Sequence, residues 1–305
     1  MWNIRLSIIT ITYNNLAGLR KTAESVLAQI VADFEWIIVD GASTDGTKEY
    51  LDSIKASYVL DQADVADNLQ IYKFTNLQII SEPDLGIYNA MNKGIRLAQG
   101  EYIQILNAGD CLAAPDVTER MLAVLVQYDE EQSVDTLVKQ PIDILYGNML
   151  KVDAEGKLIG KSGYTEYSLR QFYSSTLNHD CAYIRRALFD DDQYGLYDES
   201  LRIVSDWKWY LQAIGLGKVR PVYADIDVTI FDGGGISETN LLLRAQERRL
   251  VLEEVLPPAV LWDYDHHAFD MEQMNRLRRH HLYPLVFFME RVLFKLEKWG
   301  ILRKK

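Results

Sequence analysis

Residues 35–47 read Glu-Trp-Ile-Ile-Val-Asp-Gly-Ala-Ser-Thr-Asp-Gly-Thr, an apolar run that ends on Asp40 and passes directly into a turn of small and polar residues. The run predicts a buried strand, and the Asp and Thr residues of the turn can cap a following helix. Two further apolar runs, residues 6–12 and 102–106, also lead into polar residues, the second into Asn107-Ala108-Gly109-Asp110. These strand ends predict an α/β protein with a polar crevice at one edge of a sheet.

Strand-like and helix-like segments alternate through the first 110 residues. The expected order is strand 6–12, helix 16–29, strand 35–40, helix 47–55, strand 77–81, helix 87–98 and strand 102–106. This order predicts a mostly parallel sheet with helices on both faces. Gly100 is expected to cap the third helix. Two polar segments, residues 58–74 and 127–140, are expected to be insertions.

The second half of the chain is predicted to be mixed, and its last part helical. Residues 153–156, Asp-Ala-Glu-Gly, predict a hairpin turn. Residues 205–214 predict a helix rich in Trp and Tyr, and the three glycines within residues 232–237 predict a loop. From residue 240 onward the pattern is helical and is broken at Pro257-Pro258 and at Pro284.

Composition narrows the class of protein. Of the 305 residues, 48% are apolar and 25% are charged, which are ordinary globular values and exclude a disordered or collagen-like chain. A net charge of −12 argues against nucleic-acid binding. Two cysteines, Cys111 and Cys181, are too few for a disulfide framework and fit a reducing compartment. Without a secretory signal or an apolar run near the roughly 20 residues of a membrane span, the protein is expected to be cytoplasmic.

Four ordered blocks resemble the family-two glycosyltransferases of the GT-A fold. Residues 7–14 are similar to the family's opening strand with its Thr-Tyr-Asn signature, and residues 38–47 to its uridine-side loop. Residues 81–95, Ser-Glu-Pro-Asp-Leu-Gly-Ile-Tyr-Asn-Ala-Met-Asn-Lys-Gly-Ile, are nearly diagnostic of the family. Residues 107–110 take the place of the D-x-D metal motif, in a form similar to that of the colanic-acid and exopolysaccharide branch. The close resemblance covers roughly residues 5–115.

The resemblance implies a role for each matching residue. Asp206 would be the general base that deprotonates the acceptor hydroxyl, and His179 would act near the donor and acceptor. Asp110 would coordinate Mn²⁺ or Mg²⁺ on the diphosphate. The residues implied to bind the nucleotide-sugar are Thr12, Asn14, Asp40, Ser43, Asp84, Asn107, Gly234 and Ser237.

The function implied is an inverting transfer of a sugar from a nucleotide-diphospho-sugar, a UDP-sugar, to a hydroxyl of a surface polysaccharide or lipid-linked glycan. Residues 1–240 would form the GT-A domain, with residues 1–115 as its nucleotide-sugar half and residues 116–240 as its acceptor half. Residues 241–305 would form a basic helical extension. Two alternatives stay open: a transferase acting on a protein or small-molecule acceptor, and a non-catalytic nucleotide-sugar-binding module.

The sequence departs from the family pattern at the first loop and at the metal motif. Ile11 stands where a proline is common, and two carboxylates of the usual D-A-D-D form are missing from residues 107–110. The missing carboxylates motivate the non-catalytic alternative and put metal affinity in doubt. Intact Asp110, Asp206 and His179 speak against that alternative.

Each motif also has a structural alternative. The loop after Asp40 could be a plain turn, Asp206 could only cap the helix that follows it, and His179 could be structural. Trp207 and Trp209 could pack in the core rather than stack on sugars. The glycines of residues 232–237 could form a linker rather than meet a diphosphate.

The C-terminal tail differs in charge from the rest of the chain. Residues 276–305 contain nine Lys and Arg and two Glu, a net charge of +7, so the remaining 275 residues carry −19. The apolar residues at helical spacing in this tail are Leu285, Phe288, Met289, Val292, Leu293, Leu296 and Trp299. An amphipathic basic helix predicts peripheral contact of residues 283–305 with the inner face of the cytoplasmic membrane. The alternative is packing on the catalytic domain or in a homodimer.

Overall fold

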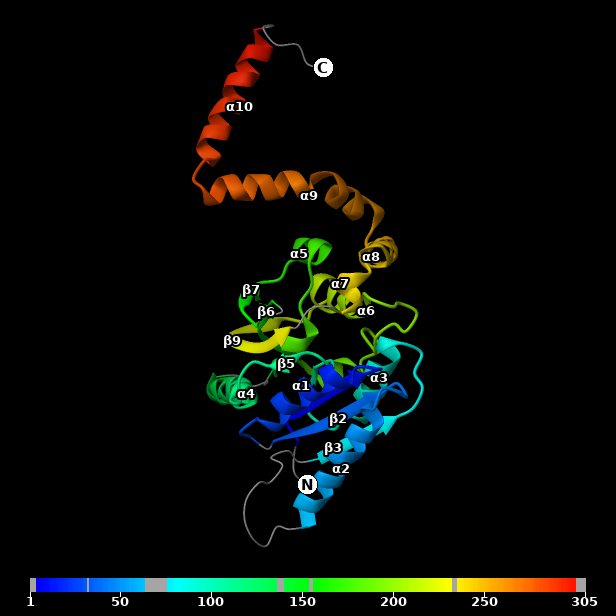
Figure 1. The fold of residues 1–305 in the computed structure, drawn as a ribbon. Coiled ribbons are helices and arrows are strands. Elements are labelled where there is room, and N and C mark those ends of the chain that lie inside the picture. Colours follow the sequence, from blue (N-terminus) through cyan, green and yellow to red (C-terminus); the bar gives the residue numbers. More distant parts are fainter. Residues whose placement is uncertain are drawn as a thin grey trace. The chain divides into compact units, whose positions relative to one another are not determined.

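Strand β1 (Leu6–Thr12) lies inside a parallel sheet and is buried along its whole length. Figure 1 shows this sheet in the computed structural model, which describes residues 4–31, 33–63, 76–135, 140–153, 156–231 and 235–299. The chain forms two compact units, Met1–Val251 and Leu252–Lys305. The sheet belongs to the first unit.

The first four long strands are all parallel. Strand β1 pairs with β2 (Phe34–Asp40) and β4 (Tyr102–Ile105), and β2 pairs with β3 (Asn76–Ser81). The connecting helices are α1 (Leu16–Leu27), α2 (Thr47–Ala63) and α3 (Ile87–Leu97). The predicted alternation of parallel strands and helices is therefore confirmed.

Helices cover both faces of this sheet. Successive side chains of a strand point to opposite faces, so each face has apolar side chains for a helix to cover. On one face, Ile8 packs in a common core with Leu19 of α1 and Leu51 of α2. On the other face, Gly94 brings α3 against Ile9, since a Cβ at Gly94 would lie 2.4 Å from Ile9 Cγ2. The sheet is thus the middle layer of the first unit.

The end of α3 differs from the prediction. The helix ends at Leu97 and Ala98 is extended, so Gly100 is not the helix cap. Gly100 is required for a different reason: its backbone passes so close to β1 that a Cβ there would lie 2.6 Å from the backbone nitrogen of Ser7.

Several helices have other limits than the sequence predicted. The segments expected to be insertions begin inside helices, because α2 continues to residue 63 and α4 (Val117–Asp135) to residue 135. Residues 64–75 and 136–139 lie outside the described residues. The helix predicted for residues 205–214 is α6 (Ser205–Tyr210), followed by a π-helical segment, Leu211–Leu216.

Beyond β4 the sheet continues with mixed pairing. Strand β8 (Ala182–Arg185) is antiparallel to β4 and to β6 (Ile144–Val152), and β9 (Pro221–Phe231) is parallel to β6. Strand β5 (Cys111–Leu112) pairs with β9, and β7 (Leu158–Ser162) pairs with β6. The β6–β7 hairpin confirms the turn predicted from residues 153–156, of which residues 154–155 are not described. The short helices of this half are α5 (Leu169–Ser174) and the 3₁₀ segments His179–Cys181 and Arg186–Leu188.

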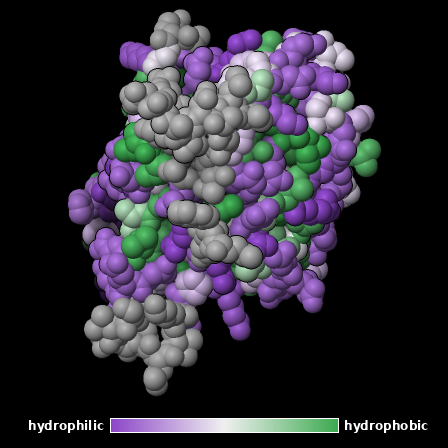
Figure 2. Space-filling view, turned by 90° about the horizontal axis from the view of Figure 1, so that it is seen from below, coloured by the Kyte–Doolittle hydropathy of each residue, from purple (hydrophilic) through white to green (hydrophobic). Residues whose placement is uncertain are grey.

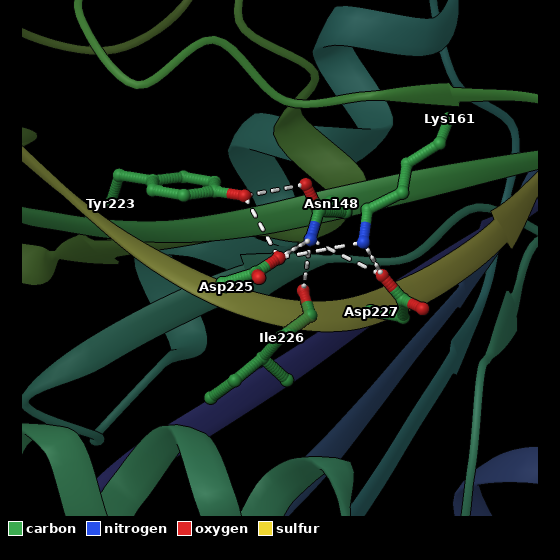
Figure 3. A network of polar contacts seen from close by, with 6 residues as sticks. All are labelled: Asn148, Lys161, Tyr223, Asp225, Ile226 and Asp227. Carbon is green, nitrogen blue, oxygen red and sulfur yellow. Dashed lines mark hydrogen bonds and ion pairs between the residues drawn. The ribbon is translucent and has the colours of Figure 1, made fainter.

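A buried amide holds the register between β6 and β9. Figure 3 shows the network formed by Asn148, Lys161, Tyr223, Asp225, Ile226 and Asp227. The pairing shifts on both sides of Asn148, so β9 carries extra residues opposite it. The Asn148 nitrogen donates to the backbone oxygen of Ile226 at 3.2 Å and to both aspartates, and its oxygen accepts from the Tyr223 hydroxyl at 2.9 Å. This network fixes the course of β9 toward its last residue, Phe231.

A second buried polar group joins strands to the α3–β4 turn. Glu35 of β2 is fully buried, and its Oε1 accepts from the Ser7 hydroxyl at 2.6 Å and from the backbone nitrogens of Gln99 and Gly100 at 2.5 and 3.2 Å. Gln78 donates to Oε2 at 3.3 Å. A buried polar group is tolerated when it is hydrogen-bonded, so Glu35 acts as a polar tie between β1, β2 and this turn.

The C-terminal part of the chain is helical. The elements are α7 (Ile236–Thr239), α8 (Leu241–Val255), α9 (Pro258–Arg279) and α10 (Tyr283–Lys298). Prolines lie in the first turns of α9 and α10, as expected of residues that cannot continue a preceding helix. Residues 232–234 of the predicted glycine loop are not described, and residues 236–239 are helical.

The two compact units divide after residue 251, whereas the sequence predicts a boundary after residue 240. The physical reason is that most of α8 is bonded to the first unit. Glu247 accepts from the backbone nitrogens of Arg202 and Ile203 at 2.8 and 2.9 Å. The functional division into residues 1–240 and 241–305 stays a prediction.

The face seen in Figure 2 is mostly hydrophilic, with smaller groups of hydrophobic residues among the polar ones. Within the described ranges, no helix combines the length and the apolar character needed to cross a membrane.

Candidate active site

A cleft of about 1040 Å³ opens where β1 and β4 end. Its walls come from the residues after these strands, the start of α3, the 3₁₀ segment at His179, the start of α6 and the end of β9. Ligands of open α/β sheets bind at the carboxyl ends of the strands. The cleft lies within the first compact unit.

Most of the predicted site residues lie together in this cleft. Those that line it are Thr12, Asp84, Asn107, Asp110, His179, Asp206 and Ser237. Asn14, Asp40 and Ser43 are in the adjoining loops and do not line it. Gly234 is outside the described residues. The chemical role of each residue stays a prediction.

Asp206 lies in the first turn of α6, and two side chains hold its carboxylate. Oδ1 accepts from the Tyr88 hydroxyl at 2.7 Å, and Oδ2 is 3.1 Å from His179 Nδ1. The other ring nitrogen of His179 is 3.1 Å from the side-chain amide of Asn107. These contacts join α3, the loop after β4, the 3₁₀ segment and α6, so Asp206 does more than begin a helix.

Asp206 and His179 form an ion pair at neutral pH. Burial opposes the charge on His179, but the hydrogen bond and charge of Asp206, aided by Asp180 and Asp110, raise its pKa to about 9. Burial likewise opposes the charge on Asp206, but the hydrogen bond and charge of His179 and the Tyr88 hydroxyl hold its pKa below the usual value. A protonated imidazole cannot accept a proton. Asp206 is therefore the member of the pair that can act as a base.

Asp40 at the end of β2 is fully buried, and its carboxylate is engaged by its own chain. The Ser43 hydroxyl donates to Oδ1 at 2.5 Å, and the Ser81 hydroxyl donates to Oδ2 at 2.6 Å. The backbone nitrogen of Ser43 also donates to this carboxylate. Through these bonds Asp40 holds the loop that follows β2 in place, and a plain turn would not need a buried carboxylate bonded in this way.

The loops after β1, β2 and β4 are fastened to one another. Asn14 has a φ of 46°, its backbone nitrogen donates to Ser43 Oγ at 2.7 Å, and its side-chain oxygen accepts from the backbone nitrogen of Thr44 at 2.8 Å. Asn15 caps α1 and donates to the backbone oxygen of Ala108 at 2.9 Å. These bonds give one edge of the cleft a preformed backbone.

Asp84 lies beside the loop that follows β2. A Cβ at Gly41 would lie 2.5 Å from its Oδ2, so a larger residue there would displace the Asp84 side chain. Its Oδ1 accepts from the backbone nitrogen of Gly86 at 2.9 Å, which turns the chain into α3.

Asp110 is the carboxylate that the sequence predicts as a metal ligand, and 8% of its surface is exposed. Its loop is fixed by Thr22, whose hydroxyl donates to the Asp110 backbone oxygen at 2.7 Å and accepts from Gly109 N at 2.9 Å. In the part of the chain that the structure describes, no group of three or more His, Cys, Asp or Glu is placed to hold a metal ion. Asp110 fits a cation carried in by a diphosphate, since Mg²⁺ is commonly held by one or two carboxylates together with substrate phosphates.

The two tryptophans of α6 are buried. The Trp207 ring nitrogen donates to the backbone oxygen of Phe172 at 2.7 Å, and that of Trp209 to Gly195 at 2.9 Å. Trp209 stacks on Phe189 and belongs to the core. Trp207 also lines the cleft, where Arg248 lies over its ring.

Sequence reasoning missed two features of this cleft. Tyr88 lies within the diagnostic block of residues 81–95 but received no role, although an aromatic hydroxyl at a helix start beside the sheet edge is a usable signal. Arg202, Arg244 and Arg248 also line the cleft. They lie outside the quoted blocks, and their convergence depends on how α8 packs, so the sequence offered no comparable signal.

The sequence profile of Glycosyl transferase family 2 matches residues 7–192, more than half of the chain. The chain therefore belongs to this family of glycosyltransferases. Its assignment to a colanic-acid or exopolysaccharide branch stays a prediction.

Individual relatives are more distant. The PGL/p-HBAD biosynthesis glycosyltransferase of Mycobacterium bovis (strain BCG / Pasteur 1173P2) is 28% identical over 235 residues, which cover 76% of this chain and 79% of the relative. Among solved structures, S. aureus TarS 1–349 in complex with UDP-GlcNAc has a TM-score of 0.58 at 18% identity, over 84% of this chain and 68% of that one. The mannosyltransferase PcManGT from Pyrobaculum calidifontis, in complex with GDP-Man and Mn²⁺, has a TM-score of 0.54 at 18% identity, over 83% and 64%. The fold is that of GT-A glycosyltransferases, as predicted.

Proposed function

We propose that this chain is an inverting glycosyltransferase that moves one sugar from a nucleotide-diphospho-sugar, a UDP-sugar, to a hydroxyl of a surface polysaccharide or lipid-linked glycan. The observation that carries the proposal is the Asp206 carboxylate, held by His179 and Tyr88 in a cleft that also contains Asp110. The complexes of TarS with UDP-GlcNAc and of PcManGT with GDP-Man support a nucleotide-sugar donor.

The proposed reaction needs one base. The acceptor oxygen attacks the anomeric carbon from the side opposite the leaving diphosphate, and its proton passes to Asp206. A carboxylate offers about four lone-pair sites, so Asp206 keeps room for the acceptor hydroxyl while Tyr88 and His179 hold its orientation. The positive charge on His179 keeps Asp206 ionised, which is the form a base requires.

The donor would lie along the loops after β1, β2 and β4. One buried oxygen in the described residues, Thr12 Oγ1, has no hydrogen-bond partner. Buried polar groups without partners are uncommon in folded proteins. We assign Thr12 Oγ1, together with the side-chain amide of Asn107, to hydrogen bonds with the bound nucleotide-sugar, with Asn14, Asp40, Ser43, Asp84 and Ser237 shaping the surrounding loops.

Asp110 would hold a divalent cation, Mn²⁺ or Mg²⁺, through one carboxylate. Such a cation, when bound, offsets the charge on the leaving diphosphate. The proposal predicts that Asp110→Ala lowers the affinity for UDP in the presence of Mn²⁺ and leaves the much weaker metal-free binding unchanged. Thermal shift with UDP, with and without Mn²⁺, measures both; equal loss in the two conditions would contradict a metal-ligand role.

Nucleoside diphosphate release from a panel of nucleotide-sugars tests the proposed function, because a non-catalytic binding module releases none. Asp206→Asn keeps the size of the side chain but removes the proton acceptor. We expect kcat to fall on the order of 10²-fold or more while UDP still binds. Asp190→Asn, at an exposed position outside the cleft, is the matched control and should keep full activity. Wild-type turnover in Asp206→Asn would rule out this base.

We also propose that α10 attaches the protein to the inner face of the cytoplasmic membrane, where lipid-linked acceptors would lie. Large apolar side chains of the helix are exposed, with Phe288 at 65% and Phe294 at 67%. Arg291, Lys295 and Lys298 add positive charge along the same helix. Each basic residue near an anionic surface contributes about 1 kcal/mol, so a few can support reversible binding.

Flotation of the full chain with vesicles of graded anionic lipid content tests this attachment. We expect binding to rise with anionic lipid and to fall with salt. The double variant Arg291→Glu/Lys295→Glu should lose binding, whereas Lys48→Glu/Lys55→Glu on α2, with the same charge change, should keep it. If the wild-type protein stays unbound at every composition and forms a tail-dependent dimer, the homodimer alternative replaces the membrane.

A further inference from the structure

Three arginine side chains, all from residues 202–248, line the cleft. Arg202 precedes α6, and Arg244 and Arg248 lie one turn apart on α8. Among the residues that the structure describes, none of these guanidinium groups forms an ion pair with a carboxylate. None of the three positive charges is therefore neutralised by direct contact with a carboxylate of the described residues, in a protein whose net charge is −12.

Arg248 is held in place without being neutralised. Its Nη2 donates to the backbone oxygens of Ser175 and Phe172 at 2.6 and 3.3 Å, and its guanidinium lies 4.4 Å from the centre of the Trp207 ring. Its Nε is buried and has no partner. A planar guanidinium oriented in this way, with unused donors, is prepared to bind an oxyanion.

The other two arginines are fixed to the same framework. Arg244 donates from Nη1 to the backbone oxygen of Ser237 at 2.9 Å. The backbone at Arg202 is bonded to buried Glu247 on α8. Like charges four residues apart on a helix repel each other, and Arg244 adds to burial in lowering the pKa of Arg248 to about 10. An anion bound between them would relieve this repulsion.

Arg248 lies on the side of the cleft that carries the candidate base, Arg244 lies one turn before it on α8, and Arg202 is bonded to Glu247 of the same helix. Arg248 stacks on Trp207, the residue next to Asp206, and Asp206 is the carboxylate whose charge acts on Arg248. The loops assigned to the donor instead bring carboxylates into the cleft, Asp84 and Asp110. An acceptor hydroxyl must reach Asp206, so a group bound by the arginines belongs to the molecule that supplies this hydroxyl.

We propose that Arg202, Arg244 and Arg248 form an acceptor subsite for a phosphate or diphosphate group, as found where a glycan is esterified to its carrier. Three guanidinium groups suit a ligand group with several negative charges, such as a phosphate or diphosphate, better than they suit a ligand with a single carboxylate. The inference rests on the proposed transferase function and specifies its acceptor as a phosphorylated one.

The experiment uses inorganic pyrophosphate as the probe for this subsite. Full-length protein is first saturated with UDP, with Mg²⁺ kept in excess over total phosphate, and pyrophosphate binding is then measured by calorimetry. The variants are Arg202→Gln, Arg244→Gln and the double variant. Arg249→Gln is the matched control, because it removes the same charge from α8 outside the cleft. Melting temperatures without ligand confirm that each variant is folded.

We expect pyrophosphate to bind the UDP-saturated wild-type protein and the Arg249→Gln control. The double variant should bind it about tenfold or more weakly, with UDP affinity changed by less than about twofold. A tenfold loss of UDP affinity would overturn the proposal by assigning the arginines to the donor diphosphate. So would pyrophosphate binding that is absent in the wild type or equal in all proteins. Wild-type protein that binds neither UDP nor any nucleotide-sugar would overturn the proposed function itself, a separate result.

Discussion

The raised pKa of His179 predicts that the folded protein loses stability as the pH rises from about 6.5 to about 9. A group whose pKa is raised by folding contributes its full stabilisation below the unfolded value and loses it as the pH passes through the folded value. Each pH unit between the two values corresponds to about 1.4 kcal/mol, so the free energy of unfolding should fall by about 3 kcal/mol across this window. The His179 side chain is only 19% exposed, so solvent screens this effect little.

Urea unfolding at several pH values between about 6 and 9.5 measures this loss, with divalent cations absent. The comparison is between the wild type and two variants, His179→Gln, which cannot titrate, and Asp206→Asn, which removes the carboxylate that raises the pKa of His179. Both variants should be less stable than the wild type at low pH and should approach it at high pH. Burial also raises the pKa of the Cys181 thiol, but this residue is present in every protein and cancels in the difference.

The reasoning is refuted if the wild type and His179→Gln lose stability in parallel across the window. His280→Gln, which replaces a histidine outside the cleft, should keep the wild-type pH profile. A variant that shifts the whole curve without changing its slope would show that His179 packs in the cleft but is not paired with an ionised Asp206.

Three further predictions concern single polar contacts. Tyr88→Phe removes one hydrogen bond to Asp206 and should lower kcat about tenfold with little change in the donor KM; unchanged kcat would mean that His179 alone orients the base. Glu35→Ala leaves the Ser7 hydroxyl and the backbone nitrogen of Gln99 without this acceptor and should lower the free energy of unfolding by about 3 kcal/mol in urea titrations, whereas a loss below about 1 kcal/mol would contradict its role as a polar tie. Asn148→Ala removes the amide between β6 and β9 and should cost about 2 kcal/mol by the same measurement, with faster hydrogen exchange confined to β9, and unchanged exchange there would show that the register does not depend on this amide.

Much of the parallel half of the fold could be predicted from local patterns. Fully buried parallel strands are continuous apolar runs, so β1 and β2 could be located almost to the residue. Residues near strand ends converge at one edge of the sheet, which explains why residues 12–15, 40–46 and 107–110 could be placed around one crevice. Element ends were less predictable. Gly100 is of the residue type that commonly caps helices, but a glycine is needed here because the backbone passes close to Ser7.

The features that could not be predicted depend on tertiary contacts between distant segments. Tyr88 and Asp206 are 118 positions apart, and their hydrogen bond forms only after α3 and α6 are both packed on the sheet. Asn148 looks like an ordinary polar residue in the sequence, although it fills a bulge created by extra residues in β9. The ion pair of Asp206 with His179 could not be predicted either, because a match to a family motif identifies a residue but not its protonation state.

The short pairing of β4 with β8 divides the sheet at Tyr102–Arg185 and Ile103–Ile184. On one side of this seam, Asn14, Asn15 and Asp45 fasten the strand-end loops through bonds made inside the first 110 residues. Substitutions beyond the seam can therefore remodel the surface that meets Asp206 while these loops stay as they are. During evolution the part of the chain beyond β4 can therefore change by recombination or drift while the strand-end loops stay the same. Descendants of such a protein can acquire new acceptors and keep the same sugar donor.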